Sequence, residues 1–192
     1  MDLVDRVKNI LVSPKQEWPR IAAEPATVHS LYVGYIMILA AIEPLAIIVR
    51  GLSFGSALVL PFAIGTYLLN LVAISIVALI VDLLAPTFGA QKDFVASLKL
   101  VAYAYTAVAV AGVFRLVPPI AAVVISIAGI YSIYTFYLGA PPVKKCPPDK
   151  AVAYAIVVLI CNIVVFWLIR LMVLPMVFGG PVMGLGAMGM LR

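Results

Sequence analysis

The sequence has little charge and few of the residues from which enzymes build their sites. Only 11% of its 192 residues are charged, and it contains one histidine and two cysteines. His29 has no cysteine or second histidine near it in the sequence, so the parts of a metal site or a Ser-His pair are missing. No Gly-x-Ser-x-Gly elbow, P-loop or Gly-x-Gly-x-x-Gly fingerprint occurs. We therefore expect a non-enzymatic protein with no catalytic residue, no metal and no cofactor.

Redox chemistry and nucleic-acid binding have equally little support. Cys146 lies in a polar stretch and Cys161 deep in an apolar one, so no bridge between them is expected. The net charge of +5 raises nucleic acid as a partner, but the 13 lysines and arginines are spread along the chain and form no basic stripe. We expect no nucleic-acid partner.

Apolar residues dominate instead, at 65% of the chain with a mean hydropathy of +1.19. A soluble domain has roughly 45–50% apolar residues. Five apolar runs approach or exceed the ~20 residues that a membrane-spanning helix needs: 31–49, 58–85, 100–117, 120–138 and 151–178. These runs predict an all-α, polytopic membrane bundle over residues 31–178 with five transmembrane helices. A cytoplasmic amphipathic segment, 1–30, precedes the bundle, and a Gly/Met-rich tail, 179–192, follows it.

The N-terminal segment has helical periodicity. Residues 2–12 place apolar side chains on one face and charged ones on the other, which predicts an amphipathic helix in the membrane interface. Ser13 and Pro14 suit the N-cap and first position of a second short helix. Trp18 is expected to anchor that helix among the lipid headgroups. The alternative is a loosely ordered tail over residues 1–27.

The run from 100 to 138 is long enough for two spans, and Pro118-Pro119 lies near its midpoint. Proline lacks the amide donor of a helical ladder, so residues 115–119 should form the bend of a helical hairpin. Small residues line both arms, which lets neighbouring helices approach closely. We predict that this hairpin is the centre of the bundle.

Lysines and arginines indicate the orientation of the spans. One side of the five-span arrangement carries nine of them: Arg6, Lys8, Lys15, Arg20, Lys92, Lys99, Lys144, Lys145 and Lys150. The other side carries four: Arg50, Arg115, Arg170 and Arg192. The excess predicts a cytoplasmic N-terminus and a C-terminus on the opposite side of a plasma or inner membrane. Eight of the nine tyrosines fall at the same proposed cytoplasmic ends, as in an interfacial aromatic belt.

Four polar or charged residues fall within the apolar runs. Glu43 lies ~18 Å along the first run at 1.5 Å per residue, next to Pro44. It is either a proton- or cation-binding carboxylate or a structural one paired with arginine, and Arg115 is the arginine closest in depth. Asn70 and Asn162 lie near the midplane and form either an interhelical amide bond or a polar pore lining. Asp82 is interfacial, where Lys99 or water can satisfy it.

The order of features resembles the Yip family of five-span membrane proteins, which is named for interacting with Ypt/Rab GTPases. The resemblance is to its prokaryotic-type members. It depends on Ser13-Pro14 with Trp18, Ile21 and Glu24-Pro25, on Tyr103-Ala104, on residues 130–134 (Ile-Tyr-Ser-Ile-Tyr) with Leu138-Gly139, and on Lys150-Ala151. It implies a helical membrane protein, in eukaryotes a trafficking adaptor, with no established catalytic residues.

These features predict a membrane scaffold or adaptor with a recruiting face on the cytoplasmic side. Its candidate contact residues are Trp18, Lys144, Lys145 and Lys150, the last three in a proline-rich loop over 139–150. The expected partners are membrane lipids and other membrane or peripheral proteins, and a homo-oligomer stays open. The alternative function is a small transporter or channel that uses Glu43, Asn70 and Asn162.

Overall fold

The computed structural model describes residues 2–52 and 59–178, so the expected Gly/Met-rich tail lies outside the described residues. Within these ranges the chain forms helices and no strand. In chain order the helices are α1 (Leu3–Val12), α2 (Pro14–Ala23), α3 (Val28–Leu31), η1 (Tyr32–Ile36), α4 (Met37–Ala40), α5 (Ile42–Leu52), α6 (Val59–Leu84), η2 (Ala85–Phe88), α7 (Phe94–Ala104), α8 (Thr106–Ala111), η3 (Gly112–Leu116), α9 (Pro118–Lys144) and α10 (Pro148–Phe178).

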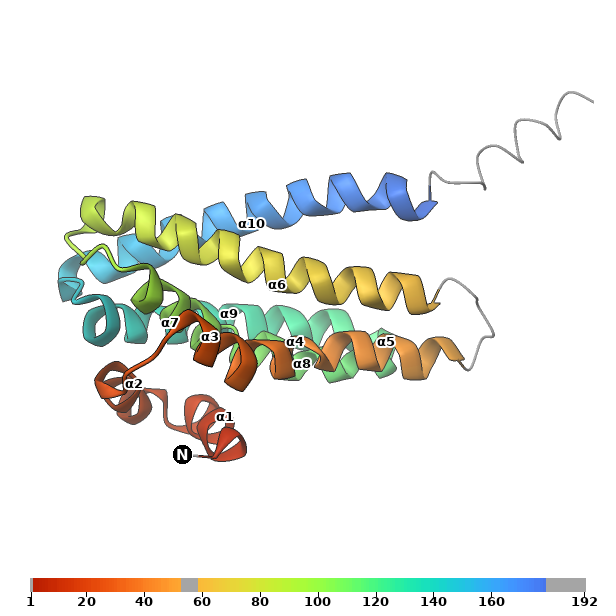
Figure 1. The fold of residues 1–192 in the computed structure, drawn as a ribbon, viewed down its shortest axis with the longest axis horizontal. Coiled ribbons are helices and arrows are strands. Elements are labelled where there is room, and N and C mark those ends of the chain that lie inside the picture. Colours follow the sequence, from red (N-terminus) through yellow and green to blue (C-terminus); the bar gives the residue numbers. More distant parts are fainter. Residues whose placement is uncertain (1, 53–58, 179–192) are drawn as a thin grey trace, which may run out of the picture.

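The described part of the chain contains five helical stretches long and apolar enough to cross a membrane. They run side by side as one bundle (Figure 1). Their bounds are Val28–Leu52, Val59–Phe88, Phe94–Leu116, Pro118–Lys144 and Pro148–Leu168. The first of them is built from α3, η1, α4 and α5 in succession. The predicted fold class, an all-α bundle with five spans, is therefore confirmed.

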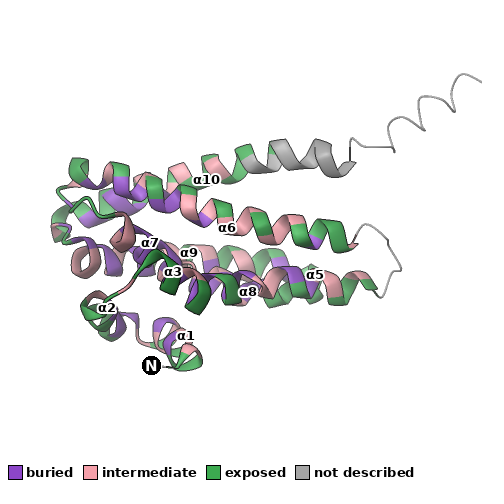
Figure 2. Cartoon of the chain, in the orientation of Figure 1, coloured by how far each residue is buried: buried purple, intermediate pink, exposed green. Residues whose placement is uncertain are grey.

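The predicted hairpin has its bend where the prolines indicated it, but only its first arm is central. The 3-10 helix η3 ends at Leu116, and α9 begins at Pro118. In the most apolar 18-residue stretch of the span formed by α7, α8 and η3, 61% of the residues are buried inside the protein, whereas in the corresponding stretch of α9 17% are buried. Figure 2 shows the same contrast, with buried residues gathered around α7. Alanines at 102, 104, 107, 109 and 111 make this possible, because they let neighbouring helices come close to the backbone of the first arm.

Helices α1 and α2 form a hairpin that packs against one end of the bundle (Figure 1). Asp2 caps α1, and Ile10 on its apolar face is 1% exposed. Trp18 is also 1% exposed and lies against Gly139, where an added Cβ would come within 2.7 Å of two atoms of the indole ring. The alternative that residues 1–27 form a loosely ordered tail is therefore wrong. The prediction that Trp18 lies among the headgroups is also wrong, because its side chain is buried in the protein. The indole finds more apolar contact in a notch on α9 than it would among headgroups.

The proline-rich segment after the fourth span is helix rather than loop. Pro141 and Pro142 lie within α9, which continues to Lys144 and ends where Lys145 adopts a left-handed conformation with φ of 52°. The last helix begins at Pro148, and Asp149 lies inside its first turn. The predicted loop over 139–150 thus shrinks to three residues between α9 and α10.

The bundle is longer than a bilayer core is thick. The Pro118–Lys144 span has 27 residues, or ~40 Å at 1.5 Å per residue, against a hydrocarbon core of ~30 Å. At the end where α1 and α2 pack, α6, α9 and α10 extend past the start of α3 (Figure 1). The hydroxyl of Tyr131 donates to the carbonyl of Leu11 at 2.9 Å, so α1 packs about halfway along α9. We call the end of the bundle that carries α1 and α2 the polar head. It consists of α1, α2 and residues 81–104 and 132–154.

Candidate functional site in the polar head

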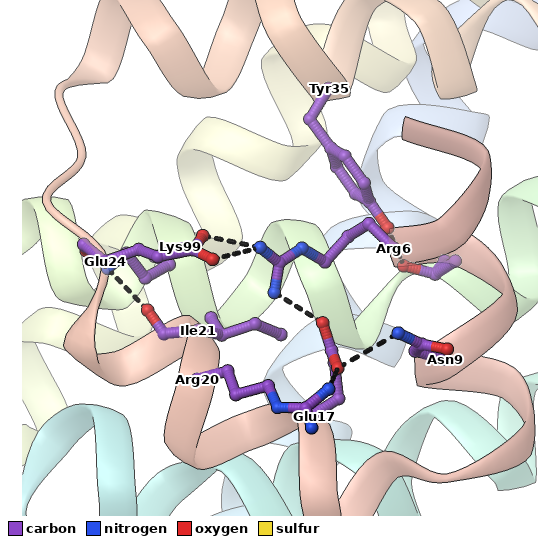
Figure 3. A network of polar contacts seen from close by, with 9 residues as sticks. Arg6, Asn9, Glu17, Arg20, Ile21, Glu24, Tyr35 and Lys99 are labelled. Carbon is purple, nitrogen blue, oxygen red and sulfur yellow. Dashed lines mark hydrogen bonds and ion pairs between the residues drawn. The ribbon is translucent and has the colours of Figure 1, made fainter. Parts of the chain in front are cut away.

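A network of charged side chains holds the N-terminal hairpin together (Figure 3). Arg6 Nη1 donates to Glu17 Oε1 at 2.6 Å, and Nη2 donates to both carboxylate oxygens of Glu24. Asn9 Nδ2 adds a donor to Glu17 at 3.3 Å. Arg6 and Glu17 are 5% and 1% exposed, whereas the Glu24 side chain is 47% exposed. One buried ion pair and one half-exposed carboxylate thus tie α1 to α2.

The guanidinium stays charged in this setting. Burial acts to lower the pKa of Arg6, but the hydrogen bond to Glu24 and the negative charges of Glu24 and Glu17 outweigh burial, so that pKa is raised. The Arg6 guanidinium also lies over the ring of Tyr103, 5.8 Å from its centroid, within the range of a cation–π contact. Because Tyr103 belongs to α7, this contact ties the hairpin to the bundle.

Lys99 is the second link between hairpin and bundle. Its Nζ lies on α7 and donates to the carbonyls of Ile21 and Glu24 at 2.9 and 2.5 Å. The last carbonyls of a helix carry the negative end of the helix dipole, and a lysine there satisfies groups that would otherwise lack donors. Lys99 thus fastens the C-terminal end of α2 to α7 (Figure 3).

A separate buried network joins α9 to α6 and α7. Lys144 is fully buried, and its Nζ donates to Asp82 Oδ1 at 3.0 Å, to Ser97 Oγ at 2.6 Å and to the carbonyl of Asp93 at 2.9 Å. Asp82 also accepts from the Asp93 amide and the Ser97 hydroxyl. The prediction that Lys99 or water satisfies Asp82 is therefore wrong, because its charged partner is Lys144. Lys144 cannot be a surface contact residue, because its charge is committed inside the polar head.

Lys145 and Lys150 do lie on the surface, on either side of the turn between α9 and α10. Between them Cys146 is 3% exposed, although its neighbours are polar. Burial, and then the charge of Asp149, raise the pKa of the Cys146 thiol. Of the four residues expected at the cytoplasmic interface, the structure thus leaves Lys145 and Lys150 accessible and buries Trp18 and Lys144.

Within the span region the structure brings Glu43, Arg115 and Asn70 together. Arg115 Nε lies 2.9 Å from Glu43 Oε1, which is the pairing expected from their depths, and Asn70 Nδ2 lies 3.4 Å from Glu43 Oε2. Gly112 permits this approach, since a Cβ there would come within 2.9 Å of the Glu43 Cβ. Asn162 is exposed on α10, and among the described residues it makes no contact with this cluster. The described cluster is therefore an ion pair with one amide, and the predicted interhelical bond between Asn70 and Asn162 is wrong.

The tyrosines near the polar head do more than line an interface. Tyr35 is 4% exposed and shares a 2.6 Å hydrogen bond with Thr106, and Tyr154 is fully buried with its hydroxyl on the carbonyl of Val81. Tyr32 reaches the carbonyl of Leu71 at 3.2 Å. Since each of these bonds joins two different helices, these three tyrosines fix helix positions. The belt interpretation is wrong for Tyr35 and Tyr154, which are buried.

Sequence reasoning missed Arg6 and Lys99 as network residues, although each had a signal. Arg6 falls in the apolar stripe of α1, three residues after Leu3 and four before Ile10. Lys99 lies between two leucines in the apolar part of α7. A charge at an apolar position of a helix needs a partner, and here both partners lie in or beside α2. Among the described residues no group of three or more His, Cys, Asp and Glu side chains is placed to hold a metal.

Comparison with known families gives one match over most of the chain. Residues 8–169 match the family described as the Yip1 domain. The match begins within α1, after Arg6, and ends within α10, so it takes in the Lys144 network and the five spans but not the cation of the N-terminal network. No curated protein and no solved structure matches.

Proposed function

The chain belongs to the Yip1 family of membrane proteins, and from this premise we propose that it is a non-enzymatic scaffold whose polar head recruits a partner on the cytoplasmic side of the membrane. The observation that carries the proposal is the construction of the head. Two ion-pair networks, each with a buried cation, hold α1, α2, α6, α7 and α9 in one arrangement. A rigid platform beside a membrane is suited to presenting a surface to another protein, because little conformational entropy is lost on contact.

The distribution of exposed charge supports both the site and the orientation. Three basic residues of the head, Arg6, Lys99 and Lys144, are buried. The remaining ones at that end are exposed: Lys8, Lys15, Arg20, Lys92, Lys145 and Lys150. An excess of lysine and arginine is typical of cytoplasmic ends, so we place the head in the cytoplasm and the far end of α10 on the opposite side. Exposed carboxylates of the same head, among them Asp5, Asp93 and Asp149, reduce the positive excess but do not cancel it. A positive excess suits an acidic protein partner or anionic headgroups.

Photo-crosslinking from the exposed face tests recruitment. A photoreactive residue is placed at position 145 or 150 in cells, and adducts of defined mass are identified by mass spectrometry. We expect a discrete protein adduct from each position. The adduct from position 145 should disappear when Lys150→Gln is added, and the adduct from position 150 should disappear when Lys145→Gln is added. Position 79 serves as the control, since Leu79 is exposed on α6 outside the head.

The transporter alternative predicts the opposite pattern. Here Glu43→Gln with Asn70→Leu would abolish ion or solute flux in proteoliposomes, and changes at 145 and 150 would leave flux unchanged. Under the scaffold proposal the Glu43 variant keeps the crosslinked adduct. Loss of flux in that variant, with no adduct from the head in the unaltered protein, would refute the scaffold.

A further inference from the structure

A cavity of about 230 Å³ lies between the N-terminal hairpin and the start of the first span. It is partly open, and side chains from α1, η1, α7 and the segment after α2 form its wall. Charges of both signs face it: Arg6, Lys99, Asp2 and Glu24. Its volume corresponds to ~8 water molecules at ~30 Å³ each, which is room for a small polar group.

The two cations of the wall keep unused donors. Among the described residues Lys99 Nζ donates to two carbonyls, which leaves one of its three N–H groups for a ligand. Arg6 donates from Nη1 and Nη2 to Glu17 and Glu24, and within the described part of the chain its Nε–H makes no hydrogen bond. Both side chains are more than nine-tenths buried, so a ligand would meet them in a site already built and held rigid.

The helix on the far side of the cavity has an unusual form. Tyr32–Ile36 is a π-helix, and its Gly34 and Tyr35 line the cavity. Single π turns inside α-helices occur often at functional sites. A Cβ added at Gly34 would meet nothing within 4 Å, so the wall is open at this residue. Ile38, one turn further along the span, is 48% exposed and continues this side of the helix toward the hydrocarbon.

The cavity lies where lipid headgroups are expected. It adjoins α1 and the first residues of the first span, at the level where the polar head meets the apolar part of the bundle. Headgroups are the polar ligands present at the highest concentration at this depth. A lipid whose headgroup fills the cavity can lay its chains along Gly34 and Ile38.

We propose that this cavity binds the headgroup of a glycerophospholipid that carries a phosphate and a primary ammonium. The phosphate accepts from Lys99 and Arg6, and the ammonium donates to Glu24 and Asp2. The four charged side chains that face the cavity, two cations and two carboxylates, sum to zero, so a headgroup with one charge of each sign matches them better than a purely anionic headgroup does. A quaternary ammonium has no N–H to donate to the carboxylates. The site should therefore prefer an ethanolamine headgroup over a choline headgroup, and a purely anionic headgroup least. This order does not depend on any recruited protein, so its failure would leave the scaffold proposal untouched.

Native mass spectrometry of the purified full chain tests the site with three defined lipids that share the same dioleoyl chains. We expect more bound phosphatidylethanolamine than phosphatidylcholine, and least phosphatidylglycerol. Gly34→Leu fills the cavity without touching the ion pairs, and it should weaken phosphatidylethanolamine binding at least ~10-fold, which is ~1.4 kcal/mol. Gly129→Leu is the matched control, because Gly129 on α9 also has open space around its Cβ.

A second variant tests the role of the carboxylates. Asp2→Asn removes a charge but keeps the side-chain oxygen that accepts from the Leu3 amide, so α1 stays capped. It should reduce the preference for ethanolamine over choline and leave thermal stability unchanged. The proposal is overturned if Gly34→Leu binds phosphatidylethanolamine as the Gly129→Leu control does. It is equally overturned if phosphatidylglycerol binds as well as phosphatidylethanolamine in the unaltered protein.

Discussion

Lys144 offers the sharpest test of how the polar head is held together. Its Nζ makes three hydrogen bonds inside the head, and its side chain is fully buried. Lys144→Met keeps most of the length of the side chain and removes the charge. The Asp82 carboxylate, 8% exposed, is then left with the Ser97 hydroxyl and the Asp93 amide as donors and with no counter-charge.

Removing one member of a buried ion pair is strongly destabilising, by ~3–5 kcal/mol. We expect the lower end, ~3 kcal/mol, since two neutral donors remain on Asp82. For a chain of this length each kcal/mol shifts the Tm by ~2–4 °C, so Lys144→Met should lower the Tm in detergent by ~6–12 °C. The adjacent Lys145→Met is the control, because its side chain is exposed and its loss should change stability by less than ~0.5 kcal/mol.

The double-mutant cycle with Asp82→Asn completes the test. The neutral amide no longer needs a counter-charge, so the double variant should lose less stability than the two single variants combined, by at least ~1.5 kcal/mol. Unfolding in a series of SDS mole fractions, followed by circular dichroism, measures all four proteins. Single effects that add to within ~0.5 kcal/mol would refute the proposed coupling between Lys144 and Asp82.

Three further predictions concern the docking of the hairpin, the reactivity of Cys146 and the orientation of the chain. Gly139→Val should displace Trp18 from its notch, destabilise the head by ~1–3 kcal/mol and speed tryptic cleavage in α2. The control Gly129→Val should have none of these effects. Equal cleavage rates in the two variants would contradict the packing of Trp18 against Gly139. Because its pKa is raised, Cys146 should react with an impermeant maleimide more slowly than an ordinary thiol at pH 7 and should accelerate as the pH rises and thiolate forms. An exposed cysteine from Lys145→Cys, in a Cys146→Ser background, should label quickly in inverted vesicles only, and labelling in intact cells would reverse the orientation.

The sequence predicted one contact of the Glu43 cluster and missed the rest, for a geometric reason. Depth along a helix is a count of residues at a constant rise, so the count alone placed Arg115 within reach of Glu43. The same count placed Asn162 near the midplane, but it says nothing about which way a side chain faces. Asn162 is exposed on α10, which packs against α6 and α9 rather than α5. Two side chains must lie at the same depth to touch, but they touch only if their helices also turn them toward each other.

The sequence by itself determined the membrane class, the number of spans and the bend before Pro118, because hydropathy, span length and the missing proline amide are local properties of the chain. Only the tertiary structure decided that Trp18 and Lys144 are buried and that Lys145 is exposed. A lysine is equally hydrophilic at positions 144 and 145. Which of the two becomes a buried structural charge depends on where the carboxylate of Asp82, 62 residues earlier, lies when α6 and α9 pack together.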